Sequence, residues 1–343
     1  MEGDALTVKV GNGVEVSAAG FACHLDPRSL SSKDALPGSV FCTSHAHSDH
    51  IPTKYERKGE NRIVSTDFTR RFISEVKGKD LLPQEHPKVT MYNAGHVTGS
   101  VMFEIEIDEQ KVLYTGDFCT RDRFRIEGAR PRKVDYLIME ATYGRPEYVF
   151  PPTDRMFGIM KDWIEDSLAQ NYSVVLFTSS NLGKTHELIH ALRDFGPHVH
   201  GTISSTSRVL KKCGLELDYV EEGDSCGDGP FVLIGANNQR AFAEIMQRHR
   251  GVRKMRRATV TGWAAGRRGG LDRGRNYGID EAFAISDHCD YNELMAFVKA
   301  CSPKKVFLEH GYSLELAESI RRETGIEACP VPNPKGQQSL MSY

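Results

Sequence analysis

The sequence lacks a continuous apolar run of 18 residues, and its opening stretch, MEGDALTVKV, combines no basic start with an apolar core. Neither a membrane-spanning helix nor an export signal is therefore expected. Neither sign of charge predominates, because 44 basic and 46 acidic residues give a net charge of −2. This balance excludes a globally basic protein, so any site for a polyanion must be local. We expect an intracellular protein, cytoplasmic or, in a eukaryote, nuclear, with no membrane partner.

Cysteine is present but never in a CxxC pair, since the eight cysteines are scattered along the chain. This spacing argues against a disulfide framework and against a zinc ribbon, and a reducing compartment is the simplest expectation. Cys42, Cys119 and Cys289 lie near polar residues of chemical interest. We interpret them as small buried apolar residues and assign them no chemistry.

The pattern of expected secondary structure changes twice along the 343 residues, and this length allows two structural units. Residues 7 to 140 read as short strands, some with the alternation of half-buried strands, with a helix around 66–76. From about residue 151, helices alternate with apolar strands, which implies a parallel sheet covered by helices. The last part returns to strands and helices, with a helix expected to begin close to Asp290 because Glu293 gives capping-box spacing. The middle unit thus reads as an insertion.

The segment FCTSHAHSDHIP, residues 41–52, is the strongest functional signal. In an extended chain His45 and His47 point to the same side, while Asp49 and His50 fall in the turn that follows. Such a cluster can present ligand groups to two separate metal ions. The alternative is a polar, solvated loop.

Further polar residues follow apolar strands elsewhere in the chain: His96, Asp117, Glu140, His288 and His310. A sheet would deliver such residues to one rim, and Asp117 is the natural bridging ligand because a carboxylate has lone pairs for two cations. Taken singly, each has an ordinary structural reading: a hydrogen-bonded loop histidine, a turn-forming aspartate at 117 or a solvated glutamate at 140. Together with the 41–52 cluster they favour a dinuclear hydrolase site.

The pattern HxHxDH, followed by GHxxGS and TGDF, resembles the metallo-β-lactamase superfamily, and MEATYG, SDHCDYNEL and LEHG resemble its β-CASP nucleases. The resemblance spans essentially the whole chain. It implies an α/β fold, an αββα metallo-β-lactamase sandwich with an inserted α/β β-CASP domain. The implied boundaries are residues 1–146 and 281–343 for the two parts of the sandwich and 147–280 for the insertion.

The same resemblance implies two zinc ions, with manganese tolerated, and a role for each motif residue. One ion is placed on His45, His47 and His96 and the other on Asp49, His50 and His310, with Asp117 bridging. Asp49 also counts among the catalytic residues with Glu140 and His288, where His288 donates a proton to the leaving oxygen and Glu140 orients its ring. Asp26, in HLDPRS, matches an aspartate that supports the ligands from outside the coordination sphere, although Asp-Pro is also an ordinary turn.

A local basic surface is expected between Arg248 and Arg275, where ten Lys and Arg residues face one acid, Asp272. This tract is typical of phosphate-backbone binding, with a merely solvated basic face as the alternative. The sequence LGKTHEL does not complete a phosphate-binding loop, because position 178 is Thr rather than Gly. We expect these candidates for contact with nucleic acid: Ser180, Lys184, Arg267, Arg268 and Arg273.

The function that these features favour is a two-zinc phosphodiesterase acting on DNA or RNA, with single strands preferred. The chain most resembles short exonuclease-like proteins associated with prokaryotic DNA ligases, which implies a DNA exonuclease leaving 5′-phosphates and partners in DNA repair. An RNA-processing endo- or exonuclease with RNA-processing partners is the alternative. A non-catalytic nucleic-acid scaffold and a small-molecule hydrolase are further classes, but no ligand is missing and the insertion argues against the latter. The sequence leaves the oligomeric state open.

Overall fold

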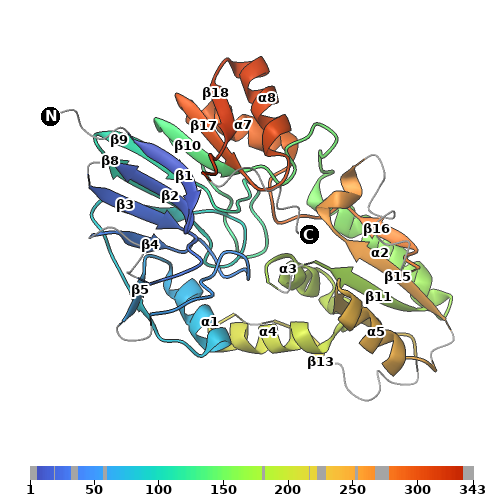
Figure 1. The fold of residues 1–343 in the computed structure, drawn as a ribbon. Helices are drawn as coiled ribbons and strands as arrows, with labels where there is room; N and C mark the ends of the chain where they lie inside the picture. The colour runs from blue at the N-terminus through green and yellow to red at the C-terminus, as the bar shows by residue number, and fades with distance from the viewer. Residues whose placement is uncertain are drawn as a thin grey trace. The chain divides into compact units, whose positions relative to one another are not determined.

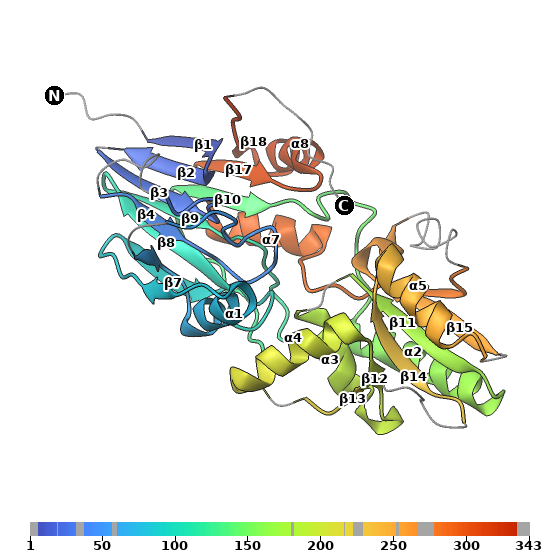
Figure 2. The same cartoon turned by 60° about the horizontal axis from the view of Figure 1, so that its bottom comes forward.

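A computed structural model of the chain describes residues 6–18, 20–31, 38–56, 60–179, 182–215, 217–221, 229–251, 254–266 and 278–334. The chain divides into two compact units. The first unit joins Met1–Arg145 to His288–Tyr343, and the second is Pro146–Asp287. Most of their helices and strands are labelled in Figure 1, and further strands are labelled in Figure 2.

The first unit is built on two facing sheets with strand orders β1-β2-β3-β4 and β18-β17-β10-β9-β8-β7 (Figure 1). The strands are β1 Thr7–Gly11, β2 Gly13–Ala18, β3 Phe21–Leu25, β4 Val40–Cys42, β7 Val89–Asn93, β8 Val101–Ile107, β9 Gln110–Tyr114, β10 Tyr136–Glu140, β17 Lys305–Glu309 and β18 Glu327–Pro330. A separate pair, β5 (Asn61–Ile63) and β6 (Leu81–Pro83), lies next to α1 (Asp67–Lys77).

Side-chain alternation along the strands creates two cores, one on each face of the larger sheet. Ile138 of β10 packs with residues of the smaller sheet, whereas Leu137 and Met139 pack in a cluster with α7 (Tyr291–Cys301) and α8 (Ser313–Thr324). This is the period-two pattern of a strand buried on both faces. One face of the larger sheet is thus covered by a sheet and the other by helices, as Figure 2 also shows.

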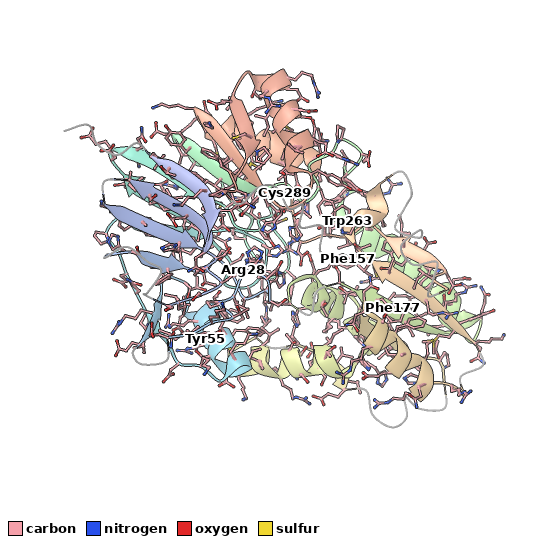
Figure 3. The ribbon with its side chains drawn as sticks, in the orientation of Figure 1. Arg28, Tyr55, Phe157, Phe177, Trp263 and Cys289 are labelled. Carbon is pink, nitrogen blue, oxygen red and sulfur yellow. The ribbon has the colours of Figure 1, made fainter. Side chains whose placement is uncertain are left out.

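The second unit is a parallel sheet with strand order β13-β12-β14-β11-β15-β16. On one face α2 and α3 pack against β11 residues Val174 and Leu176, while α5 packs against Val175 and Phe177 on the other. Figure 3 labels Phe177, and the centroid of its ring lies 5.5 Å from the ring centroid of Phe242 on α5. The elements are α2 Thr153–Ala169, β11 Ser173–Thr178, α3 Lys184–Ala191, β12 His198–Val199, α4 Gly201–Lys212, β13 Val220–Glu221, β14 Val232–Ala236, α5 Gln239–Arg248, β15 Met255–Val260 and β16 Glu281–Phe283.

The expected α/β fold, a sandwich with an inserted α/β unit, is confirmed. Two helices begin close to where the sequence indicated, and the structure gives both of them a local cap. Thr66 accepts a hydrogen bond from the backbone N–H of Thr69 at the start of α1, and Asp290 forms a capping box with Glu293 at the start of α7. None of the helices in the described ranges combines the length and apolar character that crossing a bilayer requires.

The end of the insertion differs from the boundary at 280. Strand β16 forms parallel pairs with β15, from Ala258↔Glu281 to Val260↔Phe283, and so belongs to the sheet of the second unit. Residues 281–287 therefore lie in the inserted unit rather than in the returning sandwich. The sequence of the apolar strand at 281–283 does not indicate which sheet the strand joins. Its partner strand lies 23 residues earlier in the chain, and pairing over this separation leaves no periodic pattern in the sequence.

Candidate dinuclear metal centre

Three of the candidate residues reach one rim because their strands are parallel neighbours. Strand β10 pairs in parallel with β9 on one side and with β17 on the other. Their carboxyl ends therefore meet at the same edge of the sheet. Asp117 follows β9, Glu140 ends β10 and His310 follows β17.

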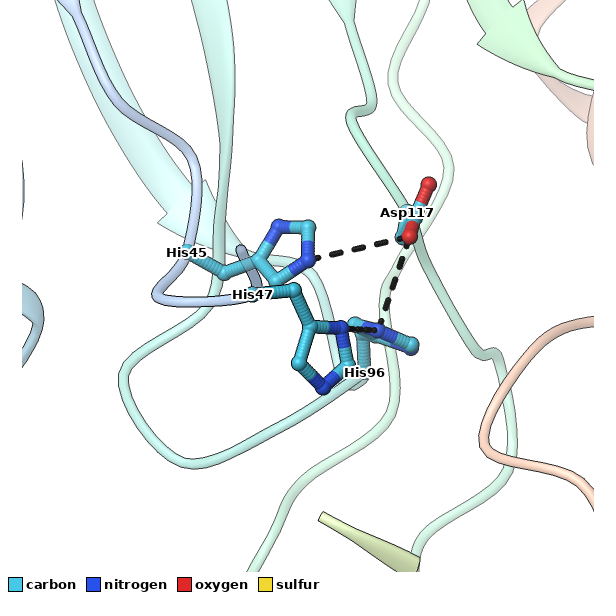
Figure 4. Close-up of side chains that lie close together, drawn as sticks. All are labelled: His45, His47, His96 and Asp117. Atoms are coloured by element: carbon cyan, nitrogen blue, oxygen red, sulfur yellow. Dashed lines mark hydrogen bonds and ion pairs between the residues drawn. The ribbon is translucent and has the colours of Figure 1, made fainter. Parts of the chain in front are cut away.

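Four side chains close around a common point at this rim: His45, His47, His96 and Asp117 (Figure 4). A carboxylate oxygen of Asp117 lies 3.7 Å from Nε2 of His45 and 3.6 Å from Nε2 of His96. Nε2 of His96 is 3.0 Å from Nδ1 of His47. Three imidazole nitrogens and one carboxylate are a donor set that suits zinc and other first-row divalent cations.

The same carboxylate also serves a second group, formed by His50, Asp117 and His310. Nε2 of His50 is 3.4 Å from the Asp117 oxygen that faces His45 and His96. The rings of His50 and His310 have centroids 5.6 Å apart. Asp117 thus stands between two potential ligand groups, the arrangement that a shared carboxylate in a dinuclear site requires.

Hydrogen bonds to Asp26, direct or through Ser44, determine which ring nitrogen carries a hydrogen in two of these histidines. Its carboxylate accepts hydrogen bonds from Nδ1 of His50 (2.8 Å) and from the Ser44 hydroxyl (2.7 Å). Because the Ser44 hydroxyl donates its single proton to Asp26, its oxygen is left to accept from Nδ1 of His45, 2.9 Å away. In both rings a hydrogen on Nδ1 is engaged by these bonds, so Nε2 is the nitrogen that is left to bind a metal.

The charges and burial of the site fit a bound cation. Nε2 of His45 is buried and has no hydrogen-bond partner among the described residues. Burial, helped by the neighbouring histidines, lowers the pKa of His45 well below its usual value, which keeps it neutral. Burial opposes charge on both Asp117 and His50, but the two groups stabilise each other's charge: the pKa of the Asp117 carboxyl falls well below normal, and Asp117 with Asp26 raises the pKa of His50 well above normal. A cation bound at Nε2 of His50 would take the place of the proton on that nitrogen. An ionised carboxylate beside a neutral imidazole whose Nε2 makes no hydrogen bond within the described residues is suited to hold a divalent cation.

Glu140, which is buried, pairs with the partly exposed His288 beside the shared carboxylate. Both oxygens of Glu140, which is 1% exposed, lie 2.9 Å from Nδ1 of His288. The backbone N–H of Phe118 and the hydroxyl of Thr142 also donate to Glu140 and fix its orientation. Ligand atoms of Asp117, Glu140 and His288 lie within 4.8 Å of one another. A carboxylate held this way favours the protonated form of the imidazole that it contacts.

Asp49 is the expected ligand that the structure does not bring into either group of the described residues. Its side chain is 70% exposed, and one of its carboxylate oxygens lies 3.7 Å from Nε2 of His50. His310 is placed by an unusual backbone, with φ of +56° followed by Gly311 at +48°. A Cβ on Gly311 would lie 2.3 Å from the carbonyl oxygen of Ala141, so the turn depends on glycine.

The expected nucleic-acid contacts are mostly outside the described residues: Ser180, Arg267, Arg268 and Arg273. Lys184, at the start of α3, is buried, and its ammonium donates to the Ser179 hydroxyl at 3.1 Å. Within the described part of the basic tract, Arg256 forms an ion pair with Asp166 of α2 at 3.0 Å. Part of the tract's charge is therefore neutralised inside the second unit.

Several residues that organise the site had not been singled out from the sequence. Ser44 links Asp26 to His45, and the Tyr114 hydroxyl donates to Asp26 at 2.8 Å. Arg121 and Arg123 contact the backbone beside two site histidines. The position of Ser44 directly before the first histidine was a usable signal. The other three act over separations of 27 to 167 residues, where the sequence offers no local pattern.

Comparisons with known proteins agree with this fold and site. Residues 280–329 match RMMBL, a Zn-dependent metallo-hydrolase RNA specificity domain. The chain is 33% identical over 298 residues to a probable DNA ligase of Opitutus terrae, covering 84% of this chain and 28% of that protein. It is 34% identical over 205 residues to cleavage and polyadenylation specificity factor subunit 3 of Dictyostelium discoideum, covering 55% of this chain and 26% of that protein.

A solved structure of a protein of unknown function from Enterococcus faecalis V583 has the same fold, with a TM-score of 0.58 and 11% sequence identity over 96% of this chain and 98% of that one. The sandwich of two facing sheets, the rim of histidines and aspartates and these similarities define a protein of the metallo-β-lactamase type. The chain belongs to the β-CASP nuclease family of the metallo-β-lactamase superfamily. It spans about a quarter of the length of the two curated relatives.

Proposed function

We propose that the chain is a two-zinc phosphodiesterase that hydrolyses nucleic acid, acting on single-stranded DNA from an end and leaving 5′-phosphates. The observation that carries the proposal is the double use of Asp117. The same carboxylate lies against His45, His50 and His96 and shares a group with Glu140 and His288. A proton donor is thus held beside a site for cations, which is the combination that phosphodiester hydrolysis needs.

In this proposal His45, His47 and His96 hold one ion, Asp49, His50 and His310 hold the other, and Asp117 is shared. A carboxylate as exposed as that of Asp49 can change rotamer when a cation binds. Two bound ions would supply a hydroxide at neutral pH and neutralise charge on the phosphate. Manganese is compatible with the same ligands.

The chain's own residues supply the proton for the leaving group. Glu140 stabilises the protonated ring of His288 through Nδ1, which leaves the Nε2–H to face the phosphodiester. As the bond from phosphorus to the 3′ oxygen breaks, His288 gives this proton to that oxygen. The products are a 3′-hydroxyl and a 5′-phosphate, and the neutral ring recovers a proton from water.

RNA is the second candidate substrate, and one observation favours it. The family model that matches residues 280–329 is described as an RNA specificity domain, and one curated relative is a cleavage and polyadenylation factor. Basic side chains read the phosphates that DNA and RNA share, so charge alone does not separate the two. Partners among DNA-repair or RNA-processing proteins would follow from the substrate.

The test uses end-labelled DNA and RNA of matched sequence, single- and double-stranded, with products resolved over time. An exonuclease releases terminal products from the first time point, whereas an endonuclease produces internal fragments. On a 3′-labelled substrate, slower migration of the labelled product after phosphatase treatment identifies a 5′-phosphate at the end that cleavage creates. A lactone and a thioester assayed in parallel test the small-molecule hydrolase class, and hydrolysis of these alone would contradict the proposal.

The site assignment is tested with Asp117→Ala and His288→Ala. We expect His288→Ala to lower the rate by about 10²–10⁴-fold, the usual contribution of a general acid, and Asp117→Ala to abolish hydrolysis. His86→Ala is the matched control, because His86 stacks on Phe21 and contacts none of the site residues named above. Unchanged rates in both site variants would refute the assignment.

A further inference from the structure

The segment that follows the shared carboxylate, residues 118–123, contacts the backbone beside two site histidines. The carbonyl oxygen of Phe118 accepts from the N–H of Cys289, and the N–H of Cys119 donates to the carbonyl of Ala94. One short stretch therefore holds the chain next to His288 and the chain next to His96. Two arginines in it extend these contacts.

Arg121 holds the backbone of His288. One end of its guanidinium donates to the carbonyl oxygen of His288 at 2.7 Å, and the other pairs with Glu293. Glu293 in turn accepts from the N–H of Asp290, at the cap of α7. Because the N–H of Cys289 also donates to Phe118, the peptide group between His288 and Cys289 is held at both its C=O and its N–H.

Arg123 holds the loop of His96. One nitrogen of its guanidinium donates to the carbonyl oxygens of both Gly95 and His96, the former at 3.0 Å. The loop lies tightly against this segment, because a Cβ on Gly95 would be 2.2 Å from the carbonyl oxygen of Cys119. Arg123 is itself anchored by reciprocal backbone hydrogen bonds with Ile126.

We propose that Arg121 and Arg123 are two positioning residues with separate tasks: Arg121 positions His288 for proton donation, and Arg123 positions His96 for metal binding. The part concerning Arg121 rests on the proposed function. The guanidinium is suited to both tasks because its planar fork supplies several donors in a fixed geometry and stays charged. Lysine at either position would keep the charge but lose the fork.

The separation is tested by kinetics on two substrates and by zinc titration of the metal-free protein. A labelled oligonucleotide has a poor leaving group that needs a proton, whereas a nucleoside p-nitrophenyl phosphate ester has a leaving group that departs without one. The variants are Arg121→Gln, Arg121→Lys, Arg123→Gln and Arg123→Lys. Arg130→Gln is the control from the same loop, because Arg130 is 60% exposed and pairs with Asp122.

For Arg121→Gln we expect kcat on the oligonucleotide to fall by about 10- to 100-fold, a fraction of a general acid's contribution. Its kcat on the p-nitrophenyl ester and its zinc affinity should change by less than about threefold. For Arg123→Gln we expect zinc affinity to fall about 10- to 100-fold, as for other residues that orient metal ligands. At saturating zinc, its two rates should return toward those of the unaltered protein.

Equal losses on both substrates in Arg121→Gln, or an unchanged zinc affinity in Arg123→Gln, would overturn the inference. If a Gln variant does not fold, as judged by circular dichroism, the Lys variant is measured in its place and the same substrate and zinc criteria apply. A chain that hydrolyses neither substrate while binding zinc refutes the proposed function instead. The zinc titration of Arg123 variants still decides the metal-positioning half in that case.

Discussion

Replacing Asp26 by Asn should weaken one of the two proposed zinc sites while leaving the backbone intact. The carboxylate accepts from four donors: the N–H and hydroxyl of Ser44, the Tyr114 hydroxyl and Nδ1 of His50. Asp26 has φ of +46°, a conformation that Asn tolerates nearly as well as Asp. The substitution therefore changes the chemistry of the side chain rather than the turn.

The amide cannot satisfy all four donors in either orientation. If its oxygen faces His50, its NH₂ group faces the Ser44 N–H, which lies 2.6 Å from the present oxygen. If its NH₂ group faces His50, the ring must accept at Nδ1 and carry its hydrogen on Nε2, where the metal would bind. A lost hydrogen bond to a charged group costs about 1.5–3 kcal/mol. Loss of a residue that orients a metal ligand lowers metal affinity about 10- to 100-fold.

The assay is zinc titration of the metal-free Asp26→Asn protein, with calorimetric melting of the same sample. We expect one ion to bind with near-normal affinity, the other to bind about 10- to 100-fold more weakly, and the metal-free first unit to lose about 2–3 kcal/mol of stability. Asp135→Asn is the control, because Asp135 accepts from the N–H of Lys111 and from Lys304 and contacts no histidine. Two zinc ions bound with normal affinity in Asp26→Asn would refute the tautomer argument.

Three other predictions concern metal, backbone and pH. Chelation of zinc should lower the melting temperature of the first unit only, since each ion present at 100 times its Kd adds about 2.7 kcal/mol; an unchanged calorimetric transition would contradict a metal site. Gly311→Ala should lower the free energy of unfolding by about 1–3 kcal/mol and weaken zinc binding, because the added Cβ would meet the carbonyl of Ala141. Gly325→Ala is the control: this glycine has φ of +72° but open space around it, so the zinc titration should stay unaltered. Burial lowers the pKa of His186 from 6.5 to about 3. The contribution of this group to the stability of the second unit is therefore complete above about pH 6.5, and the free energy of unfolding falls by about 1.4 kcal/mol per pH unit toward pH 3. His186→Leu should flatten this slope in melts between pH 7 and 4.5, and an equal slope would contradict the assignment.

Much of the local structure could be predicted from the sequence because it depends on neighbours along the chain. The helix at 67–77 follows from the Thr66 cap, and that at 291–301 follows from the Asp290 capping box. The alternation in β8 shows which of its residues face the smaller sheet. The candidate ligands were readable for the same reason, since His45, His47 and His50 sit together and Asp117 and His310 follow apolar strands.

Other features could not be predicted, because they depend on which strands become neighbours. The apolar run at 281–283 reads as a strand, but only its pairing with β15 assigns it to the inserted unit. Asp49 belongs to the same motif as His50, yet its side chain is largely exposed while that of His50 is buried. Local spacing fixes residue order and not the direction of a side chain in a turn.

The sequence by itself determined the donor types, the strand and helix pattern and the presence of an insertion, because composition, periodicity and capping act over a few residues. Only the tertiary structure decided that Asp26 sets the tautomers of His45 and His50, that Glu140 holds His288, and that two arginines after Asp117 hold the histidine loops. These contacts join residues up to 167 positions apart. They exist because parallel strands bring their carboxyl ends to one edge, a property of the sheet and not of any single segment.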